Sequence, residues 1–121
     1  MSDDLRLTVR HPRPGLAVAA VTGALDLHAA PILRAHVLDL IRQGRPHLIL
    51  DLDQVGFCDS TGLSVIIGVW HAAQEAGGSL ALAHVPDRMM RMLTLTGVDT
   101  LLPLHPTTAD AVSARPTADA G

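Results

Sequence analysis

Lysine is absent from this chain of 121 residues, and the absence removes several functions at once. A phosphate-binding loop of the GxxxxGK[ST] type needs a lysine that reaches the phosphates, so this loop is excluded. Schiff-base chemistry on a lysine side chain is excluded for the same reason. Receiver domains of two-component systems, another class of short α/β chain, normally use a lysine beside their aspartates, and this class is disfavoured.

Aromatic residues and cysteine are also scarce. Phe57 and Trp70 are the only aromatic residues, the arginines are scattered, and the formal net charge is −3. Common nucleic-acid-binding domains use basic patches and stacking platforms, so we expect no nucleic-acid partner. The single cysteine, Cys58, cannot form an internal disulfide, which favours a reducing compartment. No two of the seven histidines are three or four residues apart, so we expect neither a metal nor a cofactor.

Long hydrophobic runs are missing as well. The most hydrophobic stretch, residues 63–73, is interrupted by Ser64 and His71 and falls short of the roughly 18 apolar residues of a membrane span. The N-terminus carries Asp3 and Asp4 where a signal peptide would be basic. We therefore expect a cytoplasmic protein that has no membrane partner.

Hydrophobic periodicity predicts a single α/β domain. Strands are expected at 5–10, 16–22, 48–52, 79–85 and 101–104, with a turn at 11–15 and helices that begin near 31, 60 and 86. The order β-β-α-β-α-β-α-β-(α) implies a mixed, mostly parallel sheet of about five strands with helices mainly on one face. Pro103 confines the last strand to an edge. We expect the domain to span residues 1–113 and a flexible tail to span 114–121.

The segment most informative about function is Asp59-Ser60-Thr61-Gly62, between a buried strand and an amphipathic helix. Ligands and partners of open α/β sheets dock beyond the carboxyl ends of the strands. The same residues are also typical of a simple helix cap. A hydrolase is disfavoured, because Cys58 takes the first glycine position of the G-x-S-x-G nucleophile elbow.

Residues 59–63, Asp-Ser-Thr-Gly-Leu, resemble the Asp-Ser-[Ser/Thr]-Gly-Leu signature of the STAS domains found in anti-sigma factor antagonists. Residues 23–26, Gly-Ala-Leu-Asp, resemble the second short motif of that family, at the end of its second strand. One helix and one strand separate the two motifs, as in the family. The resemblance covers residues 5–113.

This resemblance implies a partner-switching protein that is not itself an enzyme. An unphosphorylated antagonist binds an anti-sigma factor serine kinase and frees a sigma factor; the kinase then phosphorylates the antagonist, here at Ser60 or, as second choice, Thr61. A metal-dependent serine phosphatase reverses the modification. A monomer or weak dimer is expected. The alternative is a STAS-like scaffold or accessory protein that binds partners without a phosphorylation cycle. The residues expected to bind partners are Asp26, Leu27, His28, Asp59, Ser60, Thr61, Gly62, Ser64, Arg88 and Met92.

Some side chains near this segment have a structural interpretation beside the functional one. We expect Asp59 to be a helix cap and a kinase contact rather than an acid or base, whereas Asp26 either lines the same site or belongs to a turn. Cys58 fits a small buried hydrophobe better than a redox group. The three methionines at 89, 90 and 92 are expected to fill the core, with only Arg88 or Met92 facing outward.

Overall fold

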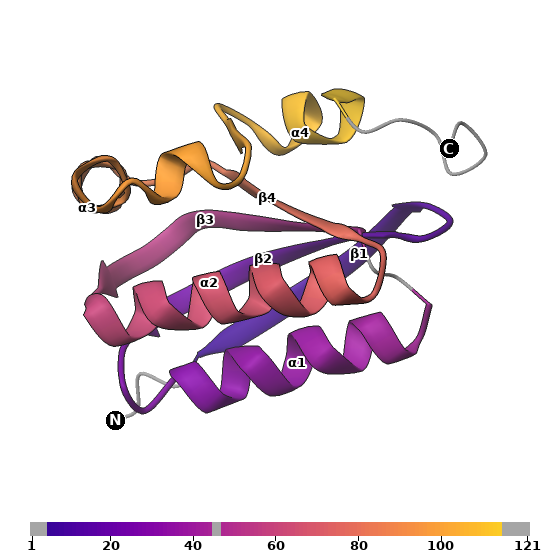
Figure 1. Ribbon diagram of the computed structural model, residues 1–121, viewed down its shortest axis with the longest axis horizontal. Coiled ribbons are helices and arrows are strands. Elements are labelled where there is room, and N and C mark those ends of the chain that lie inside the picture. Colours follow the sequence, from indigo (N-terminus) through magenta and orange to yellow (C-terminus); the bar gives the residue numbers. More distant parts are fainter. Residues whose placement is uncertain (1–4, 45–46, 115–121) are drawn as a thin grey trace.

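The computed structural model describes residues 5–44 and 47–114 and confirms the predicted α/β fold. Within these described ranges, five strands and four α-helices follow one another in the predicted order, with one short 3-10 helix added after the third α-helix (Figure 1). The elements are β1 (Arg6–Arg13), β2 (Leu16–Leu25), α1 (Ala30–Arg42), β3 (His47–Cys58), α2 (Ser60–Glu75), β4 (Ser79–Ala83), α3 (Asp87–Thr96), η1 (Val98–Thr100), β5 (Leu104–His105) and α4 (Thr108–Ala114).

The strands form one mixed sheet in the order β1-β2-β3-β4-β5. The hairpin partner β1 runs antiparallel to β2, whereas β2, β3, β4 and β5 are parallel. Parallel neighbours need crossover helices, and α1, α2 and α3 supply them. As a result, the loops that leave β2 and β3 emerge at the same edge of the sheet.

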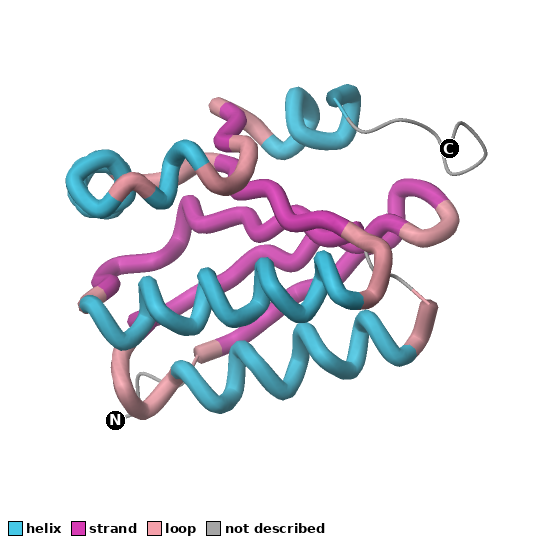
Figure 2. Tube along the Cα trace, in the orientation of Figure 1, coloured by secondary structure: helices cyan, strands magenta, loops and turns pink. Residues whose placement is uncertain are grey.

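Helices cover the two faces of the sheet unequally. Helices α1 and α2 lie side by side on one face, and α4 lies on the other side (Figures 1 and 2). The larger core cluster joins α1, α2 and α3 to alternate residues of the central strands, such as Leu48, Leu50 and Leu52. The smaller cluster packs the intervening residues, such as Ile49, against Ala111 of α4. From Leu48 to Leu50, β3 carries apolar side chains on both faces. This pattern is typical of a central strand that is covered on both faces of the sheet.

Several predicted strand limits were wrong. β1 continues to Arg13, so that the turn shrinks to Pro14 and Gly15, and β4 ends at Ala83 rather than 85. The last strand is not 101–104 but Leu104–His105. The chain leaves α3 through Gly97 in a left-handed conformation, with φ of 80°, and forms η1 before it reaches the sheet edge. Leu102 anchors this connection in the core instead of pairing in the sheet.

The most consequential difference is in β3, which continues to Cys58 instead of ending near 52. Its first half pairs with both β2 and β4, but the pairing with β4 ends at Asp51. From Gln54 to Cys58 it pairs with β2 alone, with a register shift that bulges Gly56. The second half of β3 therefore projects beyond β4, and its outer edge faces the start of α3.

Two further expectations concern the outward-facing methionine of α3 and the C-terminal tail. The first was wrong, and most of the second falls outside the described residues. Met90, rather than Met92, is the exposed methionine of α3, because Met89, Met92 and Leu93 share the core-facing side of that helix. Ala114 is the last residue of α4, so the predicted tail at 114–121 begins inside a helix, and 115–121 lie outside the described residues. The boundary at 113 stays a prediction. None of the helices described is long and apolar enough to cross a membrane.

Candidate functional site

The two short motifs of the sequence meet at the end of the sheet. Leu25, the last residue of β2, pairs with Cys58, the last residue of β3. The next residue, Asp59, donates its backbone N–H to the carbonyl oxygen of Leu25 over 3.3 Å. The segments 23–26 and 59–63 therefore form one continuous surface, and the loop before α1 lies beside the start of α2.

Asp59 caps α2, as predicted. Its backbone is extended, with φ of −106° and ψ of −172°, and its side-chain Oδ1 accepts a hydrogen bond of 3.0 Å from the backbone N–H of Gly62. Its carbonyl oxygen accepts from the N–H of Leu63 at 3.0 Å. One carboxylate oxygen thus satisfies a donor that the first turn of a helix would otherwise leave without a partner.

Ser60 is the first residue of α2, and its side chain is exposed. Thr61, the second-choice acceptor, is half-buried. Ser64 is exposed one turn further on, and its hydroxyl donates to the carbonyl oxygen of Ser60 over 3.0 Å. Of the two candidate hydroxyl groups, that of Ser60 is therefore the more accessible to a partner protein.

The loop before α1 forms the other half of this surface. Asp26 Oδ1 accepts hydrogen bonds of 3.0 Å from the backbone N–H groups of both His28 and Ala29. This arrangement is the turn expected of an aspartate at a strand end. It leaves Leu27 two-thirds exposed and His28 exposed. Leu27 is therefore an apolar side chain open to solvent between the polar residues Asp26 and His28.

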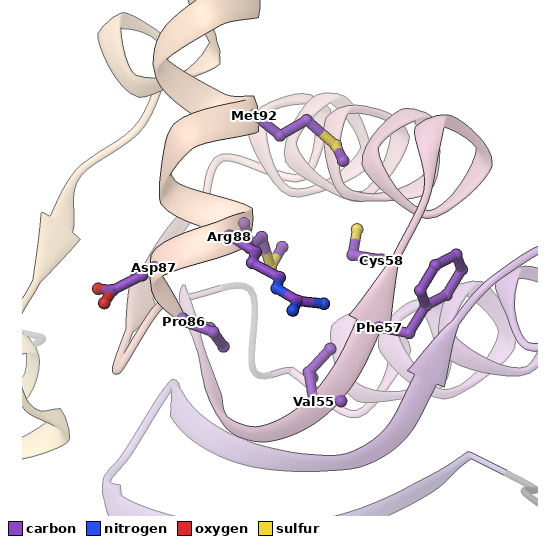
Figure 3. Close-up of a pocket in the computed structure, with 9 residues that line it drawn as sticks. Val55, Phe57, Cys58, Pro86, Asp87, Arg88 and Met92 are labelled. Carbon is purple, nitrogen blue, oxygen red and sulfur yellow. The ribbon is translucent and has the colours of Figure 1, made fainter.

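Arg88 and Met92 lie apart from the start of α2, on α3. They line a cavity of about 340 Å³ between α3 and the projecting end of β3, together with Val55, Phe57 and Cys58 (Figure 3). Sequence reasoning missed this cavity and the position of Phe57, whose side chain is 56% exposed. The available signal was Gly56, because an isolated glycine in a strand marks a bulge.

Cys58 lies between the two groups of residues and is half-buried. It packs against the larger core cluster, and its Sγ lies 3.5 Å from the carbonyl oxygen of Asp59. Burial, and secondarily the negative charge of Asp59, raise the pKa of the thiol to about 11. The side chain is therefore a neutral thiol near pH 7, which is a poor nucleophile and a poor metal ligand.

Comparison with known proteins agrees with this arrangement. A model of the STAS domain matches residues 8–111. The chain belongs to the STAS domain family. Over 82 residues this STAS protein is 34% identical to the anti-sigma-B factor antagonist of Bacillus subtilis (strain 168), an alignment that covers 68% of this chain and 74% of the relative.

Two further similarities extend over nearly the whole STAS domain. The anti-sigma F factor antagonist of Paenibacillus polymyxa is 27% identical over 111 residues, which cover 91% of this chain and 94% of the relative. The crystal structure of an anti-sigma factor antagonist from Mycobacterium paratuberculosis superimposes with a TM-score of 0.82 at 28% identity, covering 94% of this chain and 96% of that one.

Proposed function

We propose that this STAS protein is an anti-sigma factor antagonist that is switched by phosphorylation of Ser60. In its unphosphorylated form it binds an anti-sigma factor serine kinase, which then releases a sigma factor. The kinase phosphorylates Ser60 and the complex dissociates; a metal-dependent serine phosphatase regenerates the binding form. The names of the relatives above support the antagonist role. The observation that carries the switch is an exposed Ser60 hydroxyl at the first residue of α2, beside the Asp59 cap.

The free protein can accommodate a phosphate at this position. Backbone N–H groups of the first helical turn point toward the N-terminus, and the helix dipole places partial positive charge there. Phosphate groups commonly bind at such helix ends. Because Ser60 is exposed, its phosphate remains hydrated and needs no rearrangement of the core. We therefore expect the fold to survive phosphorylation with little change in stability.

A complex at the same surface cannot accommodate the phosphate as easily. Phosphorylation adds about −1.5 to −2 charges and a strongly hydrated group. Asp59 precedes the modified residue, and Asp26 lies in the adjacent loop, so the new charge joins two carboxylates. A docked partner would have to desolvate this cluster. A cost of roughly 3 kcal/mol weakens binding more than a hundredfold.

The residues around Ser60 provide the apolar part of a docking surface. Leu27 is 67% exposed and follows Asp26, while Phe57 is 56% exposed near the end of β3. Leu27 lies two residues after Leu25, and Phe57 lies immediately before Cys58. Leu25 and Cys58 pair with each other at the end of the sheet, just before α2 begins. Exposed large apolar side chains rimmed by polar groups are typical of protein interfaces. His28, in the loop before α1, and Ser64, in the first turns of α2, are exposed polar residues close in sequence to the two motifs.

The proposed cycle assigns all chemistry to other proteins. Ser60 is a substrate of the kinase and phosphatase rather than a nucleophile, so this protein is not itself an enzyme. Anti-sigma factors and their kinases act on transcription, and we accordingly propose that the chain functions in the cytoplasm. The switch requires local repulsion only, because the charge change and the docking surface coincide.

Incubation with the cognate kinase and Mg-ATP tests this function. The kinase is obtained by affinity capture on the unphosphorylated chain, and the product is analysed by intact-mass and peptide mass spectrometry. We expect one phosphate per chain, located on Ser60 and absent from Ser60→Ala. Ser60→Ala should still capture the kinase. Capture of a partner that never modifies the chain, even at saturating ATP, would instead support a STAS-like scaffold without a phosphorylation cycle.

A further inference from the structure

The cavity between β3 and α3 is a consequence of how the sheet ends. β4 stops pairing with β3 at Asp51 and terminates at Ala83, and the chain re-enters regular structure only at Asp87 in α3. The second half of β3 continues without a strand on that side. A gap of about 340 Å³ remains between the edge of β3 and the first turns of α3. This volume is near the lower end of the range for small-molecule sites.

The wall of the cavity is mainly apolar. Val55 and Met89 are buried at its base, Met92 and Cys58 are half-buried, and Phe57 is more than half exposed beside it. The neutral state of the Cys58 thiol removes a charge that would oppose an apolar ligand. An alkyl chain placed here would cover apolar surface that is now in contact with water, and each buried CH₂ contributes roughly 0.8 kcal/mol.

Asp87 and Arg88 both line the cavity. The charged side chain that reaches into it is that of Arg88. Figure 3 shows its guanidinium extending from α3 toward Val55 and Phe57, whereas Asp87 points to the opposite side of the helix. Within the described part of the chain, no hydrogen bond or ion pair engages the Arg88 side chain. Guanidinium groups prefer bidentate contacts with carboxylate and phosphate groups. The cavity thus combines an apolar wall with one unpaired cation.

We propose that this cavity binds a single-chain amphiphilic anion, whose alkyl chain packs against Val55, Phe57 and Met92 and whose head group pairs with Arg88. The limited volume selects one chain of medium length. The charge of Arg88 selects an anionic head group, either carboxylate or phosphate. The proposal does not rest on Ser60 or on its phosphorylation, although Phe57 belongs both to this cavity and to the proposed docking surface.

Titration of the full-length ¹⁵N-labelled chain with decanoate at submicellar concentration tests the site. We expect saturable chemical-shift changes centred on residues 55–58 and 87–92, and slower alkylation of Cys58 when the ligand is bound. Decyl phosphate distinguishes a phosphate from a carboxylate head group, and tighter binding of either anion identifies the preferred one. Decan-1-ol has the same chain without the charge and should bind about tenfold more weakly.

Variants of Arg88 isolate the role of the head group. Arg88→Gln should weaken binding of the anions about tenfold and Arg88→Glu further, with decan-1-ol unaffected. Arg91→Gln is the matched control, because Arg91 is exposed on the same helix and does not line the cavity. Equal losses in the Arg88 and Arg91 variants, equal affinity for decanoate and decan-1-ol, or shift changes elsewhere on the domain would each overturn the proposal.

Discussion

Gly62 of α2 packs directly on the backbone of Leu25 at the end of β2. A Cβ atom built at Gly62 would lie 2.8 Å from Leu25 Cβ and closer still to the Leu25 carbonyl oxygen. That same oxygen accepts the backbone N–H of Asp59. Because Gly62 has no side chain, the segment 59–63 can pack closely against the segment 23–26. This contact holds Ser60 beside the loop that contains Asp26.

Gly62→Ala should destabilise the fold for this reason. Because the new methyl group would meet backbone atoms, the first turn of α2 must shift, at a cost of about 1–3 kcal/mol. Gly68→Ala in the same helix is the control: its Cβ would meet only the end of the Arg34 side chain, at 3.2 Å. That variant should be neutral or stabilised by up to about 1 kcal/mol, because alanine favours a helix over glycine. Urea denaturation of both variants decides; a Gly62→Ala protein as stable as Gly68→Ala would refute the close approach.

Asp59 should contribute to stability through its cap and not through its charge. Asp59→Ala removes the acceptor for the Gly62 N–H and should cost about 1 kcal/mol. Asp59→Asn keeps an oxygen acceptor, and asparagine caps helices about as well as aspartate, so this variant should remain near wild type. The measurement is the free energy of unfolding of the three proteins at pH 7. An equal loss in both variants would assign the effect to charge instead.

Cys58 makes the stability of this chain dependent on alkaline pH. The pKa of its thiol is raised from 9.0 to about 11 in the folded protein. Between these values the unfolded chain has lost the thiol proton and the folded chain has kept it. The contribution of the protonated thiol to the free energy of unfolding is therefore fully present below about pH 9. It is lost as the pH rises through about 11.

This effect is measurable because the chain has neither lysine nor tyrosine. Lysine and tyrosine side chains ordinarily titrate at the upper end of this window, so their absence leaves fewer other groups that change charge there. We expect the free energy of unfolding to fall between pH 9 and pH 11 in the wild type, and to stay nearly level in Cys58→Ala. Identical slopes for the two proteins would show that the thiol titrates alike in both states. Asp59→Asn should lower the pKa of Cys58 part of the way toward 9.0.

Substitution of Ser60 should change partner binding and leave the fold intact. The side chain is exposed, so Ser60→Ala and Ser60→Asp should each alter stability by less than about 0.5 kcal/mol. Ser60→Ala should bind the kinase like the wild type, and Ser60→Asp at least about tenfold more weakly, because one added charge meets Asp59 and Asp26. Ser113→Asp places the same charge on α4, across the sheet, and should bind normally. Calorimetric titration of the three variants provides the comparison.

The sequence was a good guide where a single pattern has a single structural solution. Alternation of apolar runs with amphipathic helices predicted the order of the elements, and Asp59 before an apolar stripe predicted the cap of α2. The sequence was a poor guide where pairing between distant strands determines how far a strand extends. Asp53 and Gln54 are too polar for a typical buried strand, yet both belong to β3: Gln54 pairs with Thr22 of β2, Asp53 falls at the preceding register shift, and both residues are exposed.

The end of the fold and the cavity show the same limit. The apolar residues 101–104 are equally compatible with a strand and with a loop anchored by Leu102, and the left-handed turn at Gly97 decides for the loop. Residues 55–58 and 86–92 are separated in sequence by the whole of α2 and β4. They lie side by side because β4 ends early, at Ala83, and leaves the second half of β3 next to α3. No local sequence pattern predicts this contact between distant segments.

The affinity of the chain for its captured kinase, before and after complete phosphorylation of Ser60, tests the proposed switch most directly. Isothermal titration calorimetry without ATP should give a loss of more than about a hundredfold upon phosphorylation, while circular dichroism shows an unchanged fold. Treatment with a serine phosphatase should restore the affinity. An unchanged affinity of the fully phosphorylated protein would contradict the switch, even if Ser60 were modified efficiently.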